Sequence, residues 1–314
     1  MQSLLRVLAK NKSLIGLIVL VAAISFASPN FLGVGNLLNV LRQTSINAVI
    51  AMGMTFVILT AGIDLSVGSL LALCGAFAAS LIAAGHGLAS TIAIVLLAGI
   101  ALGSLSGLAI TYGAVQPFIA TLVSMTILRG VVLVYSGGRP IDASSGRASD
   151  AFGSLGEGYL IGIPVPVVVA AIAFAGCWVV LTQTRFGRYV YAIGGNESVA
   201  RLSGVNVTLI TISVYAVSGL LSAIAGITLT ARLESAQPTA GLGYELDAIA
   251  AVVVGGTSLA GGIGSMSGTL VGALIIGVLN NALNLLDVSS YYQAIAKGSV
   301  ILLAVLVDRR GKAA

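Results

Sequence analysis

The chain has 314 residues, of which 58% are hydrophobic and only 8% are charged, and its mean hydropathy is +1.08. A soluble domain carries about 25% charged residues, so this composition excludes an ordinary soluble globule. It indicates an all-α polytopic membrane protein. The net charge of +5 does not indicate nucleic-acid binding, because the basic residues flank apolar segments.

A helix needs about 20 apolar residues to cross the hydrocarbon core of a membrane. On that measure, residues 1–314 form one transmembrane domain of about ten helices. The third is interrupted near its start and the eighth is short. We expect the first to be an uncleaved span, because more membrane-spanning sequence follows it. The expected spans are 13–29, 43–60, 67–84, 88–112, 117–136, 164–181, 208–231, 247–259, 267–286 and 291–307.

Basic residues predict the orientation, because cytoplasmic loops are enriched in Lys and Arg. With an even number of spans, both termini lie on the same side as the polar segment 182–207. That side carries Arg6, Lys10, Lys12, Arg185, Arg188, Arg201, Arg309, Arg310 and Lys312, and the other side carries Arg42, Arg139, Arg147 and Arg232. We therefore expect both termini and segment 182–207 in the cytoplasm, and residues 137–163 in a loop on the outer side.

Segment 182–207 contains a short predicted helix with both ends marked. Asn196 is a preferred N-cap residue, and Gly204 permits the left-handed conformation that ends a helix. Glu197 and Arg201 are one turn apart in the favourable acid-to-base order. A helix of about seven residues is not stable alone in water, so we expect a partner to hold it.

Polar residues inside the spans are candidates for structure or transport. Asp64 and Asp247 each precede an apolar run, which favours helix caps. Asn280, Asn281 and Asn284 interrupt the ninth span, where they line a hydrated route or bond to another helix. Arg129, inside the fifth span, is a further candidate for the translocation path.

Two short stretches resemble one another across five spans: Thr60-Ala61-Gly62 before Asp64, and Thr239-Ala240-Gly241 before Asp247. Inverted repeats with broken helices at matching places are typical of transporters. No GxxxxGK[ST], HExxH or GxSxG motif and no Cys/His cluster occurs. We therefore expect no catalytic residue, no metal and no cofactor bound by this chain.

Four long stretches carry a family resemblance: GIDLSVGSLLAL, RFGRYVYAIGGNESVARLSGVNV, SAQPTAGLGYELDAIAAVVVGGTSLAGG and NNALNLLDVSSYYQAIAKGSVILLAVLVD. Together they resemble the ribose-type permeases of bacterial ABC sugar importers, over nearly the whole chain. The resemblance implies an inner-membrane permease subunit that moves ribose or a similar monosaccharide from periplasm to cytoplasm and works as a pair of copies.

By the same resemblance, its partners are a cytoplasmic ATPase with two nucleotide-binding domains, which holds the ATP and Mg²⁺, and a periplasmic sugar-binding protein. The stretch from Gly194 to Gly204 then couples to the ATPase. The expected coupling residues are Arg185, Gly194, Gly195, Asn196, Glu197, Ala200, Arg201 and Gly204.

Two other functions compete with this one. A proton-coupled secondary sugar transporter fits the possible inverted repeat and the acids inside the membrane. An intramembrane aspartyl protease built on Asp64 and Asp247 is disfavoured, because neither acid lies in a GxGD sequence.

Overall fold

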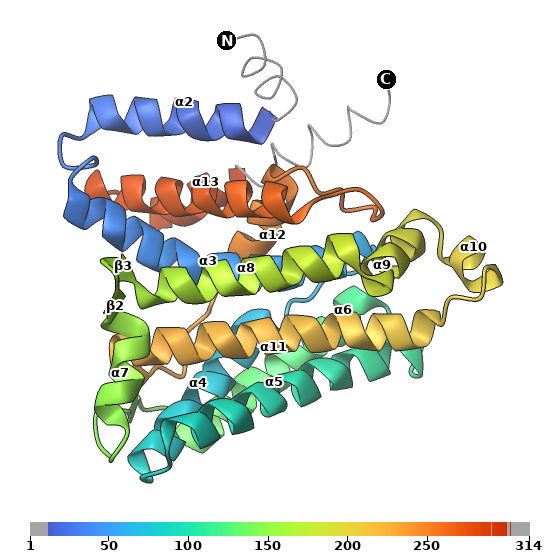
Figure 1. Ribbon diagram of the computed structural model, residues 1–314, viewed down its shortest axis with the longest axis horizontal. Coiled ribbons are helices and arrows are strands. Elements are labelled where there is room, and N and C mark those ends of the chain that lie inside the picture. Colours follow the sequence, from blue (N-terminus) through green and yellow to red (C-terminus); the bar gives the residue numbers. More distant parts are fainter. Residues whose placement is uncertain (1–11, 290, 300–301, 303–314) are drawn as a thin grey trace.

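The computed structural model describes residues 12–289, 291–299 and 302. Long helices lie side by side in a bundle (Figure 1). The first half contains α2 (Lys12–Ala27), α3 (Val34–Leu59), α4 (Val67–Ala83), α5 (Leu88–Thr111) and α6 (Pro117–Ser136). The second half contains α8 (Val165–Gln183), α9 (Arg185–Gly195), α10 (Glu197–Leu202), α11 (Val207–Leu233), α12 (Tyr244–Val254) and α13 (Met266–Leu285).

Six of the helices in the described ranges are long and apolar enough to cross a membrane: α3, α5, α6, α8, α11 and α13. Two shorter apolar helices cover Ser13–Ala27 and Val67–Ala83. Residues 291–299 and 302 are also helical, and the other residues of the expected last span lie outside the described residues. The expected eighth span is the 11-residue helix α12, about half the length that a full crossing requires.

Helix α3 begins at Val34, nine residues before the expected start at residue 43. Its first turns contain Asn36 and Arg42, which lower the hydropathy of this stretch. These polar groups have partners in the fold. Asn36 exchanges two amide hydrogen bonds with Asn281 of α13, at 2.9 and 3.1 Å. Arg42 donates to the Tyr159 hydroxyl at 2.8 Å.

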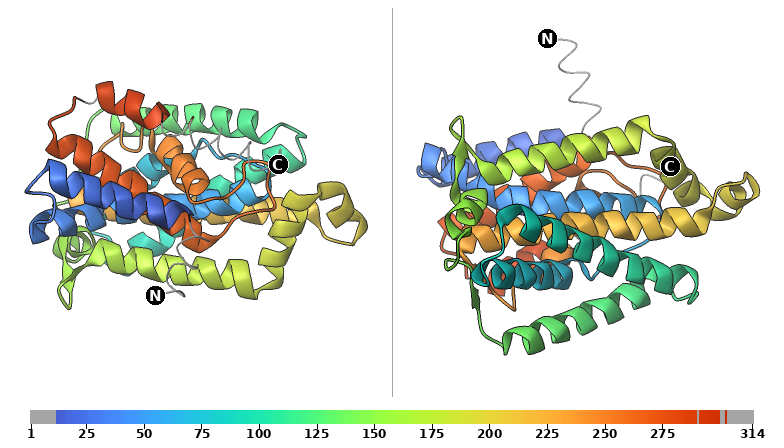
Figure 2. Two further views of the ribbon diagram at one scale, coloured as in Figure 1. Left: turned by 90° about the horizontal axis from the view of Figure 1, so that it is seen from above. Right: turned by 60° about the horizontal axis from the view of Figure 1, so that its bottom comes forward.

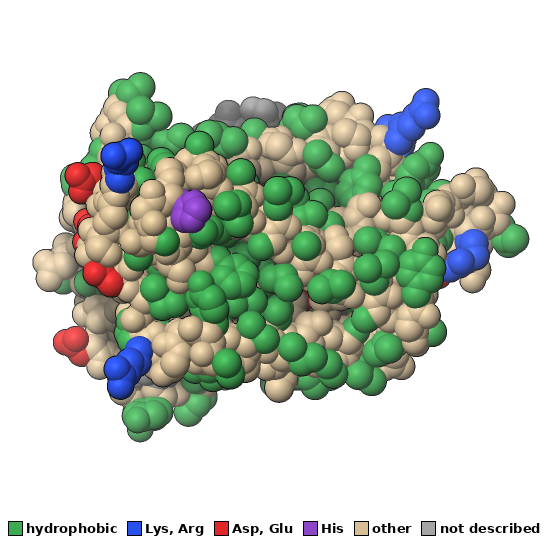
Figure 3. Space-filling view, turned by 90° about the horizontal axis from the view of Figure 1, so that it is seen from below, with side chains coloured by type: hydrophobic (Ala, Val, Ile, Leu, Met, Phe, Trp, Pro, Cys, Tyr) green, Lys and Arg blue, Asp and Glu red, His purple; other side chains and the backbone are tan. Residues whose placement is uncertain are grey.

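The surface of the bundle is largely apolar along its length. In the face shown in Figure 3, hydrophobic side chains cover the middle, and the few charged side chains gather at the two ends. Exposed residues such as Leu97, Val123 and Ile172 belong to this apolar surface. That distribution is the one expected of a protein that spans a bilayer.

One end of the bundle is covered by the loop between α6 and α8. It contains α7 (Ser149–Glu157) and the strands β1 (Ile141–Asp142), β2 (Tyr159–Leu160) and β3 (Ile163–Pro164). Strand β1 pairs antiparallel with β4 (Ser235–Ala236), which follows α11, and β2 pairs with β3. The loop is therefore fastened directly to the segment that leads into α12.

Two connecting segments separate successive helices in the same manner, and we call them the first and second interruptions. After α3, residues 60–66 lead without regular structure into α4, and after α11, residues 234–243 lead into α12. The starts of the two following helices meet inside the bundle, because a Cβ at Gly68 would clash with the carbonyl oxygen of Gly241. This gives the two ThrAlaGly stretches of the sequence equivalent positions, one before each of the helices that meet.

Candidate coupling and transport sites

Helices α9 and α10 project from the end of the bundle opposite α7 (Figures 1 and 2). The predicted ends of the short helix are confirmed: the Asn196 side-chain oxygen accepts from the Val199 amide at 3.1 Å, and Gly204 has a φ of +83°. Arg201 donates to Glu197 at 2.7 Å, as the spacing predicts. The helix that precedes it, α9, was not expected from the sequence.

One exposed face of α10 is apolar. Val199 is 57% exposed and Leu202 is 88% exposed, whereas Ala200 between them is buried. Large apolar side chains on so short and polar a segment indicate a contact surface. Sequence reasoning missed both residues, although their i, i+3 spacing within the predicted helix places them on one face.

Helix α9 lies against the end of α3, where the first interruption begins, and against the loop between α12 and α13. The Tyr191 hydroxyl donates to the carbonyl of Gly264 at 2.8 Å, in the loop between α12 and α13. A Cβ at Gly194 would clash with the carbonyl of Leu59, the last residue of α3, and with the amide of Gly262. Any movement of α9 therefore bears on the end of α3 and on the loop after α12.

The neighbouring glycines of α9 provide a matched pair of substitutions. Gly194→Ala is expected to destabilise the chain by about 1–3 kcal/mol, since overpacking displaces backbone. Gly195→Ala is expected to be mild, because nothing lies within 4 Å of its added Cβ. The melting temperature of the detergent-purified chain measures both. Equal melting temperatures for the two variants would contradict this close packing.

At the second interruption, Arg129 of α6 forms hydrogen bonds to the backbone. Its Nη1 donates to the carbonyls of Pro238 and Ala240, at 2.6 and 2.9 Å. Those carbonyls belong to the irregular segment that precedes α12, so the guanidinium supplies the donors that these backbone carbonyls require. Arg129 lines neither of the two polar cavities described below.

At the first interruption, Asp64 is buried and fully engaged. One carboxylate oxygen accepts from the amide and hydroxyl of Ser66, at 3.0 and 2.6 Å, and the other accepts from the Ser218 hydroxyl of α11 at 2.7 Å. Asp64 therefore accepts from a backbone amide as a capping side chain does, although the N-cap residue of α4 is Ser66 and not Asp64. Asp64 thus ties the interruption to α11.

The prediction that Asp247 caps its helix is wrong. The N-cap residue of α12 is Gly243, and Asp247 lies in the first turn. Its carboxylate forms an ion pair with Lys297 at 3.0 Å and lies 3.5 Å from the amide nitrogen of Asn280. Sequence spacing does not show this pair, because 50 residues separate its members.

A polar cavity of about 240 Å³ surrounds this ion pair. We call it the amide cavity, since five of its side chains are amides. Two buried atoms in its wall, the Asn280 carbonyl oxygen and the Thr44 hydroxyl, have no hydrogen-bond partner within the described part of the chain. Its lining residues are Gln43, Thr44, Ile46, Asn47, Arg232, Tyr244, Asp247, Gly277, Asn280, Asn284, Gln293 and Lys297.

The three asparagines of α13 therefore divide. Asn280 and Asn284 line the amide cavity. Asn281 points to α3, where its reciprocal bonds with Asn36 join the two helices. The expected helix-to-helix bond is therefore made by Asn281, while Asn280 and Asn284 lie where a hydrated route would require them.

Broken helices that meet inside a bundle of membrane-length helices, beside a polar cavity, define a polytopic membrane permease. The chain belongs to the family described as branched-chain amino acid transport system / permease component, whose model matches residues 36–306.

Among curated proteins, the ribose import permease protein RbsC of Haemophilus influenzae is 60% identical over 303 residues, which cover 96% of this chain and 94% of that protein. The RbsC protein of Escherichia coli K12 is 57% identical with the same coverage. That of Bacillus subtilis is 54% identical over 98% of this chain and 95% of that protein. No solved structure matches the chain.

Proposed function

We propose that this chain is the membrane-spanning permease subunit of an ATP-driven importer, and that it moves ribose or a similar monosaccharide into the cytoplasm. The observation that carries the proposal is the identity of 54–60% to ribose import permeases over nearly the whole chain. The polar cavity between α3, α12 and α13 supports it, since a sugar needs such a surface to pass an apolar bundle.

The energy comes from a separate cytoplasmic ATPase with two nucleotide-binding domains. This ATPase binds the permease at α10. Val199 and Leu202 supply an apolar anchor for an ATPase groove, and the excess of basic residues favours a cytoplasmic position for this end. A second copy of the chain and a periplasmic sugar-binding protein complete the assembly. The loop at 137–163 is the surface on which the binding protein docks.

Coupling requires that a movement of α10 reach the sugar route. Helix α9 is well placed for this, since Gly194 and Tyr191 contact the end of α3 and the loop after α12. A shift from 1:99 to 99:1 between two states needs about 5.5 kcal/mol of differential binding. ATP-driven closure of the partner ATPase supplies that difference in binding free energy. The two interruptions allow α4 and α12, the helices that follow them, to change position.

The amide cavity is the proposed binding site on the route. Amide groups offer both donors and acceptors, as a neutral polyhydroxy ligand requires. The unpartnered Asn280 oxygen and Thr44 hydroxyl are ready to accept and exchange hydrogen bonds with such a ligand. Asp247 and Lys297 neutralise one another in the wall, so the cavity holds polar groups without attracting a salt ion to that pair.

The experiment that tests the function is reconstitution. Vesicles that hold this chain with its ATP-hydrolysing partner, given sugar-loaded binding protein, are expected to accumulate ribose only with ATP, and vanadate is expected to stop them. Vesicles that hold the chain alone are expected to accumulate none. Accumulation against a gradient by the chain alone would overturn the proposal and favour a secondary transporter.

The same vesicles test the amide cavity. Asn280→Ala and Asn284→Ala are each expected to raise KM for ribose about tenfold, as the loss of a hydrogen bond to a ligand predicts. Asn281→Ala is the control on the same helix. It breaks the contact with α3, so it should lower the yield of folded chain and leave KM of the folded fraction near the unsubstituted value. Unchanged uptake, KM and assembly in the first two variants would remove the cavity from the route.

A further inference from the structure

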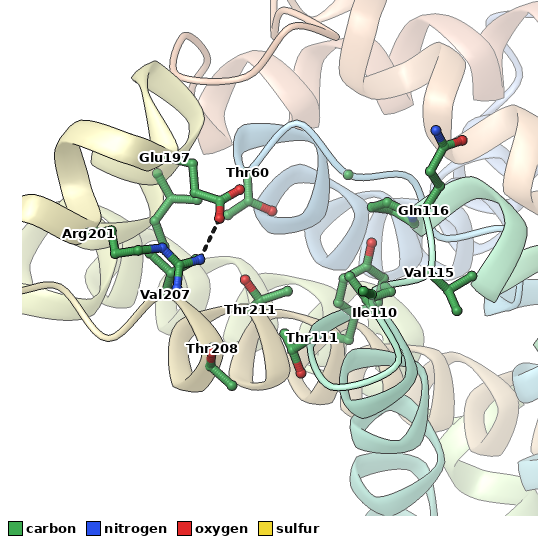
Figure 4. Close-up of a pocket in the computed structure, with 15 residues that line it drawn as sticks. Thr60, Ile110, Thr111, Val115, Gln116, Glu197, Arg201, Val207, Thr208 and Thr211 are labelled. Carbon is green, nitrogen blue, oxygen red and sulfur yellow. Dashed lines mark hydrogen bonds and ion pairs between the residues drawn. The ribbon is translucent and has the colours of Figure 1, made fainter.

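A second and larger polar cavity, of about 380 Å³, lies beneath α10 (Figure 4). Its walls carry the hydroxyls of Thr60, Thr111, Thr208 and Thr211, so we call it the threonine cavity. The Glu197–Arg201 ion pair of α10 closes one side, and Gln116, before α6, stands on another. The volume falls within the range of small-molecule sites.

This cavity is the counterpart of the amide cavity in the other half of the chain. The two halves repeat one order: a long helix (α3 or α11), an interruption, a helix that starts at the meeting point (α4 or α12), and a long helix (α5 or α13). The amide cavity is lined by the first half of α3, the end of α11 and the end of α13. The threonine cavity is lined by the start of α11, the residues just after α3 and the end of α5.

The correspondence extends to one further wall. Residues from the helical segment 291–299 line the amide cavity, and Gln116 and Pro117 at the start of α6 hold the matching place in the threonine cavity. Each cavity also has one ion pair in its wall. The threonine cavity lies at the start of α11 and the amide cavity at its end, so the two cavities lie toward opposite ends of the bundle.

The chemistry of the threonine cavity suits a neutral polyhydroxy ligand. Thr60 and Thr111 donate their hydroxyl protons to backbone carbonyls, at 2.8 Å each, which leaves their oxygen lone pairs as acceptors. Among the described residues, the hydroxyls of Thr208 and Thr211 have no hydrogen-bond partner, so they remain free to donate. Arg201 is neutralised by Glu197, so an anion has no unpaired cation to bind there.

We infer that the threonine cavity is a second binding site for the transported monosaccharide, filled from the side on which α10 lies. Sugar bound there joins α10 to α11 and to the segment after α3. It therefore restricts the movement of α10 relative to α11, and this restriction slows the next transport cycle. This inference rests on the proposed function, and it adds to it inhibition by the product.

The test uses vesicles in which α10 and the ATPase face the medium, with binding protein and labelled ribose inside. ATP drives labelled ribose out, and unlabelled ribose in the medium is expected to inhibit its initial rate. The half-inhibitory ribose concentration is obtained for each variant from its own uninhibited rate. In the double variant Thr208→Val/Thr211→Val, this concentration is expected to be about tenfold or more above that of the unsubstituted chain. The control is Ser213→Ala on the same helix, whose hydroxyl bonds to the carbonyl of Leu209.

A second measurement reports the cavity without transport. Ribose is expected to slow the labelling of a Thr211→Cys variant by a maleimide, because bound sugar covers the new thiol. The two native cysteines are buried, so the label reports on position 211. Equal half-inhibitory concentrations in the double variant and the control, or no protection of the Thr211→Cys thiol, would each overturn the inference. Failure of the proposed function looks different, since ATP would then drive no ribose movement even without ribose in the medium.

Discussion

Leu202→Asp is expected to abolish ATP-driven sugar uptake and to release the ATPase, while the permease itself stays folded. Leu202 is 88% exposed in this chain, so the substitution removes no internal contact. In the assembly it would place a carboxylate where the partner offers an apolar groove. Truncating a central apolar anchor costs about 2 kcal/mol or more, which is about thirtyfold in affinity, and an unpaired buried charge costs more.

The measurement is copurification of the ATPase with the permease, together with uptake. Ile161→Asp provides a matched control, because Ile161 is 95% exposed at the opposite end of the bundle. It adds the same charge and should leave the ATPase bound. The double change Glu197→Ala/Arg201→Ala tests whether the ion pair of α10 takes part in coupling to the ATPase. Full copurification and full uptake in this variant would argue against that role. Full copurification and uptake in Leu202→Asp would exclude α10 as the gripping point.

Lys297→Met is expected to be among the most damaging single substitutions in the membrane-spanning part. The Asp247 side chain is only 5% exposed and its cation is Lys297. Removing one partner of a buried ion pair costs about 3–5 kcal/mol, because the other charge stays buried without compensation. The expected result is a large loss of folded protein and of uptake.

A double-mutant cycle separates the ion pair from other effects. Asp247→Asn removes the buried charge and should be milder than Lys297→Met, because a partly exposed lysine reaches water more easily than a buried carboxylate. Combining the two should restore most of the melting temperature, since no uncompensated charge remains. A double variant no more stable than Lys297→Met alone would show that the two side chains do not interact.

Local features with a strong chemical signal were predicted well from the sequence. The helix at 117–136 has the predicted bounds, because Pro117 starts it and Gly137 ends it in a left-handed conformation. The short helix after Asn196 has both predicted caps and its ion pair. Each of these depends on residues within a few positions of one another, where capping and charge pairing act.

Features that depend on distant partners were missed or mistaken. Residues 34–42 were left out of the second expected span, which was placed by apolar length alone, yet Asn36 bonds to Asn281 and Arg42 bonds to Tyr159. Asp247 was assigned to a cap because its cation is 50 residues away. For the same reason, the sequence left open whether Asn281 lines the transport path or bonds to another helix, since its partner Asn36 is 245 residues away.

The sequence by itself determined that this is a membrane protein of apolar helices with one polar, capped coupling segment, since hydropathy and capping are local properties. Only the tertiary structure decided that the starts of α4 and α12 meet and that two polar cavities flank that meeting in inverted positions. It also showed that the exposed face of α10 is apolar. The meeting of the helices and the two cavities depend on which distant side chains and glycines come into contact, and no local pattern along the chain records them.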